Sequence, residues 1–61
     1  MIQKEAKIIE TKLMSEAIMK DIKGKLERID YALNRAKALR KETKDGVYSY
    51  VINILNERKE Y

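Results

Sequence analysis

The side chains able to do chemistry in this 61-residue sequence are those of Lys, Arg, Asp, Glu, Ser, Thr and Tyr, because it contains neither His nor Cys. The usual catalytic bases and nucleophiles are therefore missing, and disulfides, zinc fingers and imidazole-bound metals are excluded. Gly24 and Gly46 lie 22 residues apart, which rules out a glycine-rich phosphate loop. We expect a protein that is not an enzyme and that uses no cofactor and no metal.

The basic residues are concentrated in the middle of the chain. The formal net charge is +4, and residues 25–46 carry seven Lys or Arg against four acids. Within this segment Lys37, Lys41 and Lys44 form one row at helical spacing, with Arg40 beside them. Such a row could neutralise the phosphates of a nucleic acid. Cations at the end of a helix also interact favourably with its dipole, so a solvated helix end is the alternative interpretation.

The Asp-Gly pair at residues 45–46 lies in a weak match to a helix-turn-helix. Gly46 would occupy the turn, and Tyr50 and Asn53 would face the bases, since Asn can pair with adenine in the major groove. Against this interpretation, Glu42 stands where a small residue is expected, and Glu57 would repel phosphates. Nucleic-acid binding by the basic row together with Tyr50 and Asn53 is therefore an alternative function.

Residues 2–43 have the composition of a helix, rich in Ala, Leu, Met, Ile, Lys and Glu. At 100° per residue, one apolar stripe contains Met14, Ile18, Ile22, Leu26, Ile29, Leu33 and Ala36. This stripe stays in phase across Gly24. We therefore favour a continuous or gently kinked helix over a turn at Gly24, although such a helix would be about 63 Å long and thus far above the usual length.

A second apolar stripe points roughly the opposite way. It contains Ile2, Ala6, Ile9, Leu13 and Ala17, and Tyr31 falls in line with it further along. We interpret these six residues as an interface with a partner, most simply a second copy of the chain. The alternative is that a third helix of the same chain covers them.

The segment after the Asp-Gly pair, "GVYSYVINILNERKEY", predicts a shorter helix that runs back along the first. A strand is the competing prediction, because the segment contains β-branched and aromatic residues and Asp-Gly favours hairpins. A hairpin needs a second strand, however, and the preceding "ALRKETK" has little strand character.

These patterns predict a single small helical domain over residues 1–61. Its class is all-α: a long or kinked helix plus a shorter antiparallel C-terminal helix, as a helical hairpin or a three-helix bundle. Because so short a chain buries only about 60% of its unfolded surface, we expect dimerisation to complete the core. The sequence lacks an apolar run of membrane-spanning length and a signal-peptide pattern, so we expect a cytoplasmic protein without a membrane partner. We expect a regulator, adaptor or inhibitor that packs helices against itself and another protein.

Overall fold

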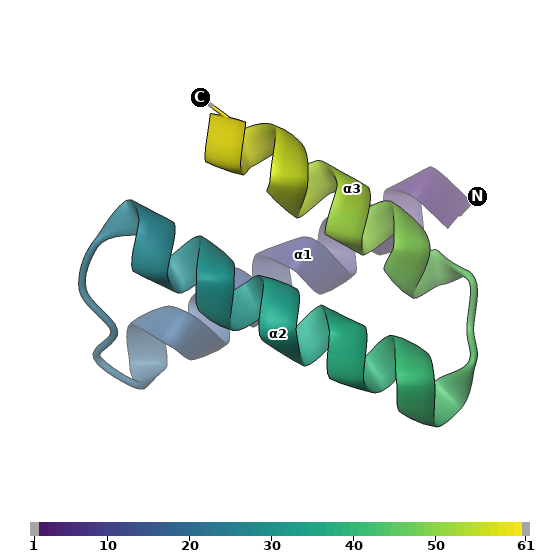
Figure 1. Cartoon of the computed structure of the whole chain (residues 1–61), viewed down its shortest axis with the longest axis horizontal. Coiled ribbons are helices and arrows are strands. Elements are labelled where there is room, and N and C mark those ends of the chain that lie inside the picture. Colours follow the sequence, from purple (N-terminus) through teal and green to yellow (C-terminus); the bar gives the residue numbers. More distant parts are fainter. Residues whose placement is uncertain (1, 61) are drawn as a thin grey trace.

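The computed structural model describes residues 2–60, and the side chains of residues 3–59, as three α-helices (Figure 1). They are α1 (Ile2–Met19), α2 (Lys25–Thr43) and α3 (Val47–Glu60). α2 runs back along α1, α3 runs back along α2, and each helix packs against the other two. Residues 2–60 include no strand. The predicted all-α class is confirmed in its three-helix form, and the competing strand after Gly46 is not formed.

The prediction of a continuous or gently kinked helix across Gly24 is wrong, because α1 ends at Met19 and α2 begins at Lys25. The N–H of Asp21 donates to the carbonyl oxygen of Ile18 at 2.9 Å, and that of Ile22 donates to Ala17 at 3.1 Å. Asp21 has φ 62°, so these bonds form a Schellman motif with an aspartate at the left-handed position. The helix thus stops five residues before Gly24, the glycine that the sequence suggested as the breaking point.

Gly24 begins the second helix. Its φ of 91° lies in a region that side-chain-bearing residues rarely adopt, and its carbonyl oxygen accepts the first helical hydrogen bond, from Arg28 N–H at 3.0 Å. The Arg28 side chain steadies the connection, since its Nε donates to the Ile22 carbonyl at 2.7 Å. Hydrogen bonds to Asp21, Ile22 and Gly24 therefore hold the turn between α1 and α2.

The second connection, residues 44–46, is the helix-to-helix corner that the Asp-Gly pair predicted. Its left-handed residue is Lys44, with φ 57°, whose N–H donates to the Arg40 carbonyl at 2.9 Å. Asp45 then starts α3, because its Oδ1 accepts the Val47 N–H at 3.0 Å. The acidic residue of the pair caps the new helix, while Lys44 ends the old one.

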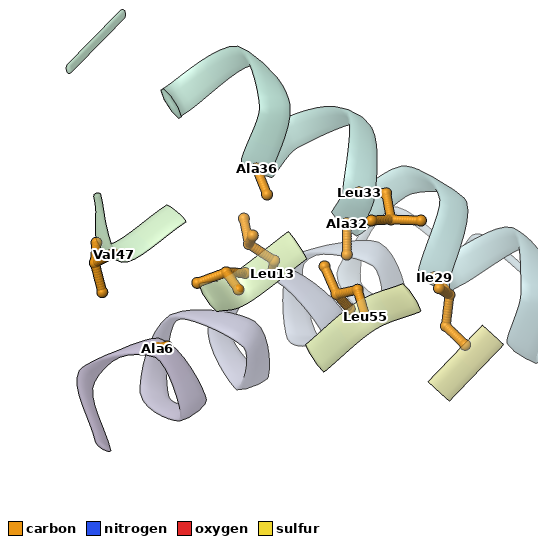
Figure 2. Packing of buried hydrophobic residues seen from close by; sticks show 9 residues of the cluster. Ala6, Leu13, Ile29, Ala32, Leu33, Ala36, Val47 and Leu55 are labelled. Atoms are coloured by element: carbon orange, nitrogen blue, oxygen red, sulfur yellow. The ribbon is translucent and has the colours of Figure 1, made fainter. Parts of the chain in front are cut away.

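The core lies where the three helices meet (Figure 2). Leu13 of α1, Ile29 and Leu33 of α2, and Leu55 of α3 supply the large buried side chains. Four alanines are fully buried among them and leave room for close helix packing: Ala6, Ala17, Ala32 and Ala36.

Candidate interaction surfaces

The stripe predicted as a partner interface lies largely inside the single chain. Ala6, Leu13 and Ala17 are buried, and Ile9 is half-buried against the same core. The side chain of Ile2 lies outside the described residues. α2 and α3 cover the described part of this stripe. This arrangement matches the alternative prediction, in which helices of the same chain cover the stripe. A partner would have to open the bundle to reach Leu13.

Tyr31 lies beside α1, in line with that stripe as its spacing indicated, but it joins two helices of one chain. Its hydroxyl donates to Glu16 Oε1 at 3.2 Å. Partial burial raises the pKa of Tyr31 above its ordinary 10.0, and the hydrogen bond and negative charge of Glu16 raise it further, with a small opposing effect of Arg35. The tyrosine therefore links α1 to α2.

Glu10 is a buried acid that the sequence reasoning missed. Its side chain is 2% exposed, and its Oε1 lies 2.8 Å from Arg58 Nε and 3.7 Å from Lys7 Nζ. A signal was present in the sequence, because Glu10 lies four residues after Ala6 and three before Leu13, on the buried side of α1. The Arg58 pair ties the first helix to the last.

The structure brings together the four basic residues that the sequence selected. Lys37, Arg40, Lys41 and Lys44 line one depression of about 430 Å³ at the C-terminal end of α2. Their side chains are exposed, and its lining includes no acidic residue. This cluster is called the basic depression below.

Tyr50 and Asn53 do not join the basic depression. They line a second hollow of about 430 Å³ between α1 and α3, together with Gln3, Lys7, Ile54 and Glu57. α3 also lies back along α2 (Figure 1) and does not project as a separate recognition helix would. The six residues predicted for nucleic acid thus form two separate surfaces.

Large apolar side chains are exposed near the connection between α1 and α2. Ile18 and Leu26 are 54% and 57% exposed, Met19 is more exposed still, and Ile22 is half-buried. α3 has 14 residues, against 18 in α1 and 19 in α2. Figure 1 shows the C-terminal ends of α1 and α3 diverging on this side of the molecule. We call this surface (Ile18, Met19, Ile22, Leu26) the apolar end.

Residues 2–60 contain neither a candidate metal site nor a membrane-spanning helix. Within that range, no group of three or more acidic side chains could hold a metal ion. None of the helices formed by those residues combines the length and apolar character needed to cross a membrane.

Comparison with known proteins finds no match that indicates a function. No protein-family model matches the chain, and neither a curated protein nor a solved structure shows significant similarity to it.

Proposed function

We propose that this chain is a small non-enzymatic regulator, adaptor or inhibitor that works by packing its helices against a protein partner, and that it forms a homodimer. The observation that carries the proposal is the apolar end, where Ile18, Met19 and Leu26 stand exposed together. A single exposed apolar side chain is ordinary, whereas a group of them indicates an interaction surface.

The exposed area of the whole chain supports this proposal. The chain exposes 4612 Å², whereas a compact monomer of 7.2 kDa is expected to expose about 4100 Å². The excess of about 500 Å² approaches the roughly 800 Å² that each partner contributes to a standard interface. A partner that covers the apolar end would remove much of this excess.

The charges around the apolar end favour a second copy as the partner. Both cations and acids lie along the connection and the start of α2: Lys20, Asp21, Lys23, Lys25 and Glu27. A two-fold contact brings one patch against the same patch, so it needs a surface on which both signs are present. The basic depression, by contrast, would repel its own copy.

Sedimentation over a range of protein concentrations tests the proposal. We expect a dimer for the natural sequence and a folded monomer for the double variant Ile18→Asp/Leu26→Asp, because charges would be buried at the interface. Ile8→Asp is the matched control: Ile8 is also exposed on α1, but about 15 Å along the helix axis from Ile18. It should remain dimeric.

Two outcomes would count against the proposal. A natural sequence that stays monomeric throughout would remove the homodimer, and a dimer that survives Ile18→Asp/Leu26→Asp would place the interface elsewhere. Leu13→Asp is unsuitable as an interface variant, because Leu13 is 3% exposed in the core and a charge there should unfold the chain.

A further inference from the structure

The basic depression gathers four cations on one surface, and its lining contains no acid. Its four cations come from the last two turns of α2 and the residue after it, Lys37 to Lys44. Among the described side chains, those of residues 3–59, the acids that form ion pairs are Glu10 and Asp30, and both pair with cations outside the depression. The positive charge of the depression is therefore left for a ligand.

We propose that the basic depression binds the phosphate backbone of a nucleic acid. From Lys37 to Lys44 the helix rises by about 10 Å. One strand of a duplex presents a phosphate about every 3.4 Å along its axis, so the row spans about three phosphate steps. Lys37, Arg40 and Lys41 share one helix and Lys44 is its C-cap, so the backbone positions of the four residues are set before any ligand arrives.

The surroundings of the depression favour a nucleic acid over a membrane surface. Peripheral membrane binding combines basic residues with apolar side chains that enter the lipid. The large exposed apolar residues are Ile8, Ile18, Met19, Leu26 and Tyr50, and none of them belongs to residues 37–46. The basic depression thus offers charge without an apolar anchor.

We expect the side chains of the basic depression to contact the phosphate backbone of the nucleic acid and not its bases. Base recognition needs side chains that enter a groove of the duplex, and Tyr50 and Asn53 lie in the other hollow, between α1 and α3. Arg40, which could pair with guanine, lies in a row of lysines whose length matches the spacing of phosphates. The depression itself is lined by Lys and Arg alone. We therefore expect similar affinity for duplexes of different sequence.

The helix backbone opposes this binding slightly. The C-terminal end of a helix carries partial negative charge, and the Arg40 carbonyl there is bonded to the Lys44 N–H. Two acids, Glu42 and Asp45, also lie nearby in the sequence. The long side chains must therefore hold the phosphates away from the backbone, which predicts weak and strongly salt-dependent binding.

Fluorescence anisotropy with a labelled duplex DNA at several salt concentrations tests the inference. We expect a Kd of about 10⁻⁴ to 10⁻⁶ M near physiological salt, and a slope of about −3 to −4 when the logarithm of the binding constant is plotted against that of the salt concentration. Lys37→Gln/Lys41→Gln should reduce the slope by about 2 and weaken binding on the order of 50-fold at about 0.1 M salt.

Lys4→Gln/Lys12→Gln is the matched control, since it removes the same charge from exposed positions of α1 outside both proposed surfaces. It should change the affinity only slightly. Equal losses in both double variants would show attraction by net charge alone and overturn the inference. So would binding to vesicles of anionic lipid, or to polyglutamate, in preference to DNA.

The dimer proposal rests on other residues, so the two can fail separately. Ile18→Asp/Leu26→Asp should keep its sensitivity to Lys37→Gln/Lys41→Gln whether or not the chain is dimeric.

Discussion

Glu10 carries a charge on a helix face that is otherwise apolar, and Arg58 compensates for it. Arg58 Nε lies 2.8 Å from Glu10 Oε1, although this oxygen receives no hydrogen bond of ordinary geometry. The attraction is therefore mainly between charges. Because Glu10 is 2% exposed, water cannot replace the arginine if it is removed.

We expect Arg58→Met to lower the free energy of unfolding by about 1–3 kcal/mol, because it leaves a buried carboxylate without its cation. Urea denaturation followed by circular dichroism measures this loss. Lys59→Met is the control: Lys59 pairs with Asp30 at 3.0 Å, but both side chains are about half exposed. Such a pair contributes only about 0–1 kcal/mol, and an equal loss in both variants would contradict the account of Glu10.

The titration of Tyr31 makes the stability of the folded chain depend on pH. Its pKa is raised in the folded chain, first by partial burial and then by Glu16, so the folded state holds the phenolic proton more tightly than the unfolded state. Stability from this group is fully present below about pH 10, the unfolded value, and is lost as the pH rises through the folded pKa.

We expect Glu16→Gln to move the titration of Tyr31 down towards pH 10, because it removes the negative charge beside the hydroxyl. Ultraviolet absorbance of tyrosinate follows the titration, and Tyr31→Phe identifies its contribution among the four tyrosines. An unchanged titration in Glu16→Gln would exclude the contact as a cause of the shift.

At the scale of elements, the two glycines have different roles. Gly24 begins α2 with φ 91°, and a Cβ built there would meet only Glu27, at an ordinary 3.7 Å. The strain of a substitution thus comes from the backbone and not from a clash. A Cβ at Gly46 would meet nothing within 4 Å.

We expect Gly24→Ala to destabilise the bundle by about 1–3 kcal/mol, because a residue with a Cβ is strained at φ 91° and ψ 132°. Gly46→Ala should be neutral or stabilising by up to about 1 kcal/mol, because it restricts the unfolded chain. Thermal unfolding of the two variants provides the comparison. Equal effects would show that the backbone at Gly24 is not the constraint.

The elements also show what the sequence was able to predict. Apolar periodicity indicated the helical character of residues 2–43 and the buried side of α2 from Ile29 to Ala36, but it joined α1 and α2 into one helix. The breakers around Asp45 located the corner before α3. Periodicity could not find the end of α1, because Ile18, Ile22 and Leu26 stay in phase across residues 20–24. The left-handed residue that stops the helix is Asp21. Aspartate adopts this conformation only occasionally, so its presence in the sequence does not predict a helix end.

Local spacing in the sequence predicted one of the candidate surfaces but not the burial of the other. The basic row was found because Lys37, Lys41 and Lys44 lie at helical spacing close together in the sequence, so local spacing fixed their proximity although Lys44 is the C-cap of α2. Burial of Leu13, by contrast, depends on how three helices meet, which local spacing does not determine. The ion pair of Glu10 with Arg58 joins residues 48 positions apart and had no local pattern to reveal it.

At the scale of the whole molecule, the two surfaces lie at opposite ends of α2, along a body about 30 Å in its longest dimension. The apolar end surrounds the first connection, and the basic depression adjoins the second. A dimer formed through the apolar ends would leave both basic depressions exposed. Self-association and backbone binding are therefore compatible in one assembly.

The connection between α1 and α2 has a consequence for how two copies can exchange parts. Residues 20–24 depend on left-handed conformations at Asp21 and Gly24, while the apolar stripe remains in phase through them. A chain that straightened there would become one long helix, and its α1 would pack on the α2 and α3 of another copy. The turn at Gly24 thus separates a closed three-helix chain from a domain-swapped dimer with the same core contacts.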